Sequence, residues 1–161
     1  MIELHYYPSN ASFAPHILLE EMGIPFTLRV VDRNNNEHKS AAYLKLNPNG
    51  LIPVLVDGDL VLYETAAILM HLADCHPGFA PAPGTPERAQ YYKWMTWLTN
   101  TLQAMLIHYF YPDRMGAVLS TPAAQADVHA RVNIGMVFDN RYHHDHYYPA
   151  PGYVEIGRAH V

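Results

Sequence analysis

Hydrophobic and polar positions alternate along Ile2–Tyr7, which is the two-residue period of a strand with one buried face. The period lengthens to that of a helix over Phe13–Met22, with Ser12 as the predicted N-cap and Gly23 as the terminating residue. Pro25–Val31 then predicts a second strand. The beginning of the chain is therefore expected to fold as strand, helix and strand.

Two further apolar runs, Leu51–Val56 and Leu60–Tyr63, predict another pair of strands. The Asp57-Gly58 sequence between them favours the positive φ that a tight hairpin turn requires. Glu64-Thr65 follows at once and opens a predicted helix over Ala66–Ala73, where apolar residues recur at helical spacing. These elements together predict an α/β domain over residues 1–76.

The rest of the chain changes character. Residues 77–85 are rich in proline and glycine and are expected to be a linker. Residues 86–110 predict one long helix, and residues 121–138 a second one that Gly135 weakens, within an all-helical region over residues 86–139. The first of these helices carries an apolar stripe at helical spacing, formed by Tyr91, Met95, Leu98, Leu102, Met105 and Tyr109.

Composition narrows the class of protein. Half of the 161 residues are hydrophobic and the net charge is −5, without the clustered Lys and Arg that nucleic-acid binding requires. No apolar run approaches the roughly 20 residues that span a bilayer, and the N-terminus has no secretion-signal pattern. The single cysteine, Cys75, excludes an internal disulfide and a CxxC redox pair. We therefore expect a cytoplasmic protein without nucleic-acid or membrane partners.

Pro53 interrupts the first hairpin strand, where a central strand would need a backbone donor. Either that edge is left open for a ligand, or the Ile52–Pro53 bond is cis. An unpaired edge can bind a peptide-like ligand as a strand does, and the nearby helix start at Glu64-Thr65 offers free N–H groups to a carboxylate. This combination suits a small acidic peptide that carries a thiol.

The Asn47-Pro48-Asn49-Gly50 turn, the Ile52-Pro53 pair, the hairpin and Glu64-Thr65 follow one another in an order that resembles the glutathione-binding half of cytosolic glutathione S-transferases, most closely bacterial, beta-like and theta-like members. The resemblance implies a thioredoxin-like α/β domain followed by an all-α domain. It also implies conjugation of the glutathione thiolate to electrophilic small molecules, with glutathione as co-substrate and no metal.

In this family the loop after the first strand carries the residue that activates the glutathione thiol. Ala11 stands where beta-class members have a cysteine, so a mixed-disulfide mechanism is not supported. The candidates are Ser12, favoured because a hydroxyl at a helix start stabilises a thiolate, then Ser9 and Asn10. Ser12 also has a plain reading as an N-cap, and the two roles are compatible.

The resemblance also implies the residues that bind glutathione. Ile52 beside Pro53 would pair through its backbone with the cysteinyl part, Glu64 would accept the γ-glutamyl ammonium, and Thr65 would hold the adjacent carboxylate. His38 has the spacing of a theta-like histidine near the glycine carboxylate. Lys39 would assist electrostatically. Both of these residues also fit a solvated loop.

Family members form homodimers and bind an apolar electrophile beside the long helix, where Trp94, Trp97 and Tyr109 are either pocket or core residues. A complete member has further helices, so we expect a truncated chain. Residues 140–161 have no helical period and end in a sequence like a translated sequencing adapter, which predicts a non-native tail. Its histidines are not expected to bind metal. Two alternatives stay open: a non-catalytic glutathione-binding module, and a glutathione-dependent disulfide reductase that uses Asn10.

Overall fold

The computed structural model describes residues 1–112, 116 and 120–132. The predicted tail over residues 140–161 and the end of the second predicted helix lie outside this part of the chain. Two compact units divide between Met95 and Thr96. The predicted domain boundaries at residues 76 and 86 remain predictions.

The first unit contains a four-stranded mixed sheet with strand order β2-β1-β3-β4. Strand β1 pairs with β2 in parallel and with β3 in antiparallel orientation, and β4 pairs antiparallel with β3. The elements of this unit are β1 (Ile2–Tyr6), α1 (Phe13–Met22), β2 (Phe26–Val30), η1 (Glu37–Lys39), α2 (Ala41–Leu44), β3 (Val54–Asp57), β4 (Leu60–Tyr63), α3 (Thr65–Cys75) and most of α4 (Pro86–Trp97). The predicted α/β domain is confirmed.

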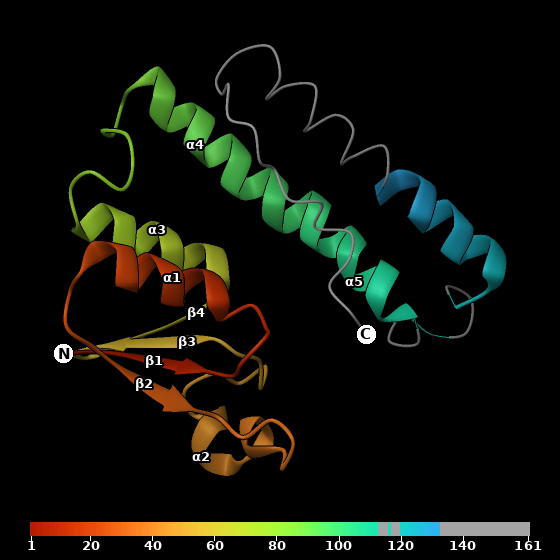
Figure 1. Cartoon of the computed structure of the whole chain (residues 1–161), viewed down its shortest axis with the longest axis horizontal. Coiled ribbons are helices and arrows are strands. Elements are labelled where there is room, and N and C mark those ends of the chain that lie inside the picture. The colour runs from red at the N-terminus through yellow and green to blue at the C-terminus, as the bar shows by residue number, and fades with distance from the viewer. Residues whose placement is uncertain (113–115, 117–119, 133–161) are drawn as a thin grey trace. The chain divides into compact units, whose positions relative to one another are not determined.

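The helices cover both faces of this sheet (Figure 1). Helices α1 and α3 lie side by side on one face, and α2 covers the other. The larger core, between the sheet and α1 and α3, is formed by Ile2, Leu4, Leu19, Leu55, Ile68 and Leu72. Val31, Tyr43 and Val54 form a smaller cluster under α2. Because successive strand residues point to opposite faces, Val54 and Leu55 serve different layers.

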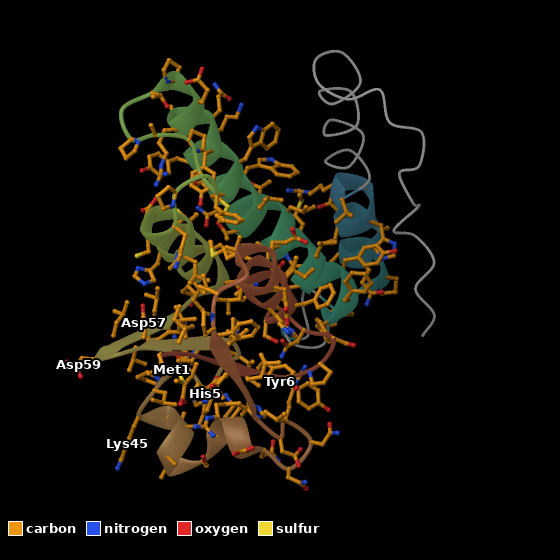
Figure 2. The ribbon with its side chains drawn as sticks, turned by 60° about the vertical axis from the view of Figure 1, so that its left-hand side comes forward. Met1, His5, Tyr6, Lys45, Asp57 and Asp59 are labelled. Atoms are coloured by element: carbon orange, nitrogen blue, oxygen red, sulfur yellow. The ribbon has the colours of Figure 1, made fainter. Side chains whose placement is uncertain are left out.

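The predicted hairpin is confirmed as well. Asp57 pairs with Leu60, and the turn residue Gly58 has a φ of +59°. This left-handed backbone is favourable for glycine because it has no Cβ. The hairpin turn lies at the opposite end of the sheet from Tyr6, as the labelled Asp57 and Asp59 show in Figure 2.

Contacts of Arg88 connect the linker and the start of α4 to α3 within this unit. Its side chain is 4% exposed, forms an ion pair with Asp74, and donates from Nη1 to the Pro81 carbonyl at 3.0 Å. The guanidinium also lies over the rings of Tyr91 and Tyr92, at 5.0 and 4.8 Å. The hydrogen bond to Asp74 raises the pKa of Arg88, so the guanidinium group stays protonated. The predicted linker over residues 77–85 is therefore anchored at its end.

The long predicted helix over residues 86–110 is helical throughout but is not one regular α-helix. Its middle, η2 (Leu98–Gln103), is a π-helix, and α5 (Ala104–Phe110) follows. The Thr99 hydroxyl donates to the Thr96 carbonyl at 3.1 Å, a local bond of the kind that disturbs regular helix pairing. The predicted helix is therefore continuous over residues 86–110, and the change to a π-helix at Leu98 was not part of the prediction.

The second unit, from Thr96 onward, also includes a helix at residues 122–132. Thr121 caps it, because the Ala124 N–H donates to the Thr121 hydroxyl at 3.3 Å. The Tyr109 ring stacks against His129 with ring centroids 4.2 Å apart, and meets Phe110 edge-on at 4.8 Å. A helical second part of the chain is therefore confirmed. No helix within the described residues has both the length and the apolar character needed to cross a membrane.

Candidate functional site

Four chain segments meet at one edge of the sheet. The register places Tyr6 beside Val30, and places both His5 and Tyr63 beside Val54. The loop after β1, the loop after β2, the segment before β3 and the residues after β4 therefore leave the sheet at the same edge, next to the labelled Tyr6 in Figure 2. The sequence candidates Ser9, Ser12, Pro53 and Glu64 lie on these segments, so the fold brings them to one edge.

The loop between β1 and α1 is held together by Ser12. This residue is 1% exposed. Its hydroxyl has two acceptors in reach, the Tyr7 carbonyl at 3.0 Å and the Asn10 Oδ1 atom at 2.6 Å, and it accepts from the Tyr7 N–H at 3.2 Å. Asn10 Oδ1 also accepts from the Ser12 N–H at 2.8 Å. Ser9 is exposed and has a φ of +57°.

The prediction that the Ser12 side chain caps α1 is wrong. Ser12 occupies the N-cap position, but its φ and ψ of −69° and −12° are already helical and its side chain makes no capping bond. The hydroxyl turns back to Tyr7 and Asn10 instead. The hydrogen-bond partners of this hydroxyl therefore depend on how the loop after β1 folds back onto the end of that strand.

The Ile52–Pro53 bond is cis, one of the two arrangements that the sequence allowed. Pro53 is buried, and β3 begins only after it, at Val54. The prediction that this strand begins at Leu51 is wrong. The Leu51 carbonyl is bonded to the side chains of Tyr43 and Asn47, both at 2.9 Å, instead of to a neighbouring strand.

Glu64 stands at the start of α3 with an exposed side chain and an unusual backbone. Its φ of +74° and ψ of +116° lie in a sparsely populated region for a residue with a Cβ, and such strain clusters at functional sites. Its side chain does not cap α3, whose first helical residue is Thr65. The backbone N–H groups of this first turn are therefore not taken by a Glu64 capping bond, and they carry the positive end of the helix dipole.

His38 and Lys39 lie in η1 and pack against the turn that precedes Pro53. The Lys39 ammonium donates to the Asn49 carbonyl at 3.1 Å. A Cβ atom on Gly50, whose φ is +60°, would lie 2.7 Å from Lys39 Nζ and 2.9 Å from the His38 carbonyl, so this position requires glycine. Burial lowers the pKa of His38, and its buried Nδ1 atom has no hydrogen-bond partner within the described residues.

The sequence did not single out Tyr43 and Asn47 as donors to the segment before Pro53. Asn47 was considered only as part of the turn that carries the family resemblance, and Tyr43 only as part of a packed helical turn. Both are buried, at 5% and 2% exposed. A signal was present, because an asparagine before proline and an amphipathic tyrosine both keep a polar group that needs a partner when buried.

In the described part of the chain, no three His, Cys, Asp or Glu side chains are grouped closely enough to bind an ion. The groups at the sheet edge are of another kind. They are a hydroxyl-bearing loop, a cis-proline segment, an open helix start with a carboxylate, and a histidine with a lysine. Such a set suits an extended organic ligand with both an ammonium and carboxylates.

Comparison with known proteins gives the same picture. The family model described as "Glutathione S-transferase, N-terminal domain" matches residues 8–75. Human glutathione S-transferase theta-2 is 43% identical over 65 residues, which cover 40% of this chain and 27% of that protein.

Two solved structures extend the likeness beyond the first unit. The bacterial glutathione transferase BphK, solved as a ternary complex, is 31% identical with a TM-score of 0.75, over 89% of this chain and 70% of that one. A glutathione transferase homologue from Sulfitobacter, solved with bound glutathione, is 27% identical with a TM-score of 0.69, over 91% of this chain and 70% of that one.

The chain spans about half the length, or less, of the curated relatives that it matches. The match to BphK nevertheless covers most of both chains, and the family model covers the segments that form the sheet edge. The four-stranded mixed sheet with its covering helices agrees with the structural likeness to both solved proteins. This chain belongs to the glutathione S-transferase family.

Proposed function

We propose that the chain binds glutathione at the edge of the sheet where Pro53 leads into β3 and Glu64 follows β4. The observation that carries this proposal is the register around Val54, which brings the Ile52–Pro53 segment and the open start of α3 to the same edge. A tripeptide lying along Ile52 would reach the first turn of α3 with its γ-glutamyl end. The glutathione bound in the Sulfitobacter relative supports the choice of ligand.

Each end of glutathione has a partner of opposite charge in this arrangement. The Glu64 carboxylate would accept the γ-glutamyl ammonium, and the Thr65 hydroxyl with the α3 dipole would hold its carboxylate. His38 and Lys39 would lie toward the glycine carboxylate. The Lys39 ammonium already binds the Asn49 carbonyl, so its contribution would be a long-range attraction or would require that bond to open.

The thiol would be activated from the loop between β1 and α1. A hydroxyl donor stabilises a thiolate and lowers its pKa from about 8.5. Ser9 is exposed, whereas the Ser12 proton already has two acceptors inside the loop. We therefore assign thiol contact to Ser9 first, with Ser12 and Asn10 holding the loop, which reverses the order expected from the sequence.

Conjugation of an apolar electrophile, detoxification, homodimerisation and a cytoplasmic location are parts of the proposal that concern the whole protein. The second candidate function, a non-catalytic glutathione-binding module, is favoured by the engaged and buried Ser12 hydroxyl. In the disulfide-reductase alternative Asn10 would use its Nδ2 group, because a thiolate accepts hydrogen bonds, and the contacts with Ser12 involve only the Asn10 side-chain oxygen.

A thermal melt of the 161-residue chain with and without glutathione tests the binding proposal. A ligand that binds only the folded state at ten times its dissociation constant stabilises that state by roughly 1.4 kcal/mol. The melting midpoint is then expected to rise by about 3–6 °C. Ophthalmic acid, which replaces the thiol by a methyl group, is the matched ligand for contacts that do not involve sulfur. A cooperative melt that glutathione leaves unchanged would contradict the proposal.

Replacing Ser9 and Ser12 separately by alanine distinguishes a thiol donor from a loop residue. Ser9→Ala is expected to lower the rate of conjugation about 10- to 100-fold and to leave the affinity for glutathione unchanged, because the lost bond forms to the thiolate. Ser12→Ala is expected to lower the melting midpoint as well, since it removes three contacts inside the loop. If Ser9→Ala keeps full activity while Ser12→Ala is stable but inactive, Ser12 and not Ser9 contacts the thiol, as the sequence predicted.

A further inference from the structure

The Leu51 carbonyl oxygen accepts two side-chain hydrogen bonds just before the Ile52–Pro53 pair. The Tyr43 hydroxyl and the Asn47 Nδ2 atom both donate to it at 2.9 Å. The Leu51 side chain is 58% exposed, so its own packing does not hold this residue in place. The two donors therefore determine where the peptide between Leu51 and Ile52 lies.

Tyr43 is a rigid donor. It packs with Val31 and Val54 in the cluster under α2, and its ring meets the His5 ring edge-on, with centroids 6.2 Å apart. Its backbone N–H donates to the Ser40 hydroxyl at 3.2 Å, which caps α2. Burial raises the pKa of Tyr43 to about 12, so the hydroxyl keeps its proton throughout the neutral range.

Asn47 is equally well fixed. Its backbone N–H donates to the Tyr43 carbonyl at 3.0 Å, and its own carbonyl accepts from the Gly50 N–H at 2.8 Å. Its side-chain Oδ1 atom accepts from the Asn49 N–H at 3.0 Å. A backbone hydrogen bond thus joins Asn47 to Tyr43, and both residues are held in place by contacts other than their hydrogen bonds to Leu51.

Holding one carbonyl fixes the next backbone donor. Among the described residues the only cis peptide bond follows Ile52, so the peptide between Leu51 and Ile52 is trans. In a planar trans peptide the N–H points away from the C=O. The direction of the Ile52 N–H is therefore set by the bonds that Tyr43 and Asn47 make on the opposite side.

We propose that Tyr43 and Asn47 are positioning residues for glutathione, which orient the Ile52 backbone toward the cysteinyl part of the ligand by holding the Leu51 carbonyl. This inference rests on the proposed function and concerns two residues that act through Leu51 and Ile52. A backbone that is held in its binding geometry before the ligand arrives binds more tightly, because less conformational freedom is lost on binding.

The test compares glutathione affinities of the full 161-residue chain and its variants by titration calorimetry. Tyr43→Phe removes only the hydroxyl and is expected to raise the dissociation constant about three- to tenfold. Asn47→Asp keeps the acceptor for Asn49 but replaces the donor, and it is expected to have a larger effect. Because both changes act on one carbonyl, the double variant is expected to lose less affinity than the two separate losses combined.

Two controls separate positioning from general destabilisation. Val56→Ala shortens a side chain that packs against the same cluster as Tyr43 but lies away from the proposed site. It is expected to lower the melting midpoint without changing the affinity for glutathione. In ¹⁵N-labelled protein, the Ile52 amide resonance is expected to shift on saturation with glutathione, and to shift less in Tyr43→Phe.

The outcomes distinguish the inference from the proposed function. If the wild-type chain does not bind glutathione, both are overturned. If the wild-type chain binds and Tyr43→Phe binds equally well with the same Ile52 shift, the positioning role is overturned and the proposed function stands. If Val56→Ala weakens glutathione binding as much as Tyr43→Phe does, the effect of Tyr43→Phe reflects lost stability, and the inference is overturned.

Discussion

Replacing Glu64 by alanine is expected to raise the dissociation constant of glutathione roughly 10- to 100-fold, the range for loss of a hydrogen bond to a charged group. The Glu64 carboxylate is exposed and stands at the open start of α3, where it would meet the γ-glutamyl ammonium. Titration calorimetry on the purified chain measures the effect. Glu21→Ala, which removes an exposed carboxylate from α1, is the matched control and is expected to bind normally.

A second variant, with glycine at position 64, separates the effect on glutathione binding from the effect on folding stability. The φ of +74° at Glu64 is unfavourable for any residue with a Cβ, at a cost of roughly 1–3 kcal/mol. Glu64→Gly is therefore expected to melt at a higher temperature than Glu64→Ala, while it binds glutathione equally weakly. Unchanged affinity in both variants would remove Glu64 from the proposed site, whatever happens to the melting midpoint.

Replacing Leu55 by alanine is expected to lower the free energy of unfolding by about 2–5 kcal/mol, the range for large-to-small changes in a packed core. Leu55 is 0% exposed and lies in β3, in contact with the core that α1 and α3 cover. The lost methyl groups leave a cavity that the surrounding helices fill only partly. Denaturant unfolding followed by circular dichroism gives the change directly.

Leu60 in β4 provides the comparison for Leu55. It is the same residue type in the same sheet, but its side chain is 40% exposed, so truncation removes less buried surface. Leu60→Ala is expected to change the free energy of unfolding by less than about 1 kcal/mol. Equal losses for the two variants would show that the core of the first unit is not where the structure places it.

Local sequence was sufficient wherever an element depends on its own residues. The bounds of α1 follow from an apolar helical period that ends at Gly23, and the hairpin between β3 and β4 follows from Gly58 with its positive φ. The start of α3 at Glu64-Thr65 was also predicted, although the positive φ of Glu64 was not. The end of α1 and the hairpin turn depend on backbone preferences that act over a few residues, so they can be predicted from local sequence.

Features that depend on distant partners were predicted incompletely or wrongly. The Ser12 hydroxyl turns back to Tyr7 instead of capping α1, and the Leu51 carbonyl, three residues before the start of β3 at Val54, accepts from the side chains of Tyr43 and Asn47. A polar side chain near several donors and acceptors takes the partner that the closed fold brings to it.

The sequence by itself determined the order of the elements, the resemblance to glutathione S-transferases and the candidate residues from Ser9 to Thr65. Only the tertiary structure decided which of these residues meet. The register of β1, β3 and β4 brings the loop after Tyr6, the segment before Val54 and the start of α3 to one edge. The physical reason is that strand pairing and burial join segments far apart in the chain, and neither is expressed in any local pattern of residues.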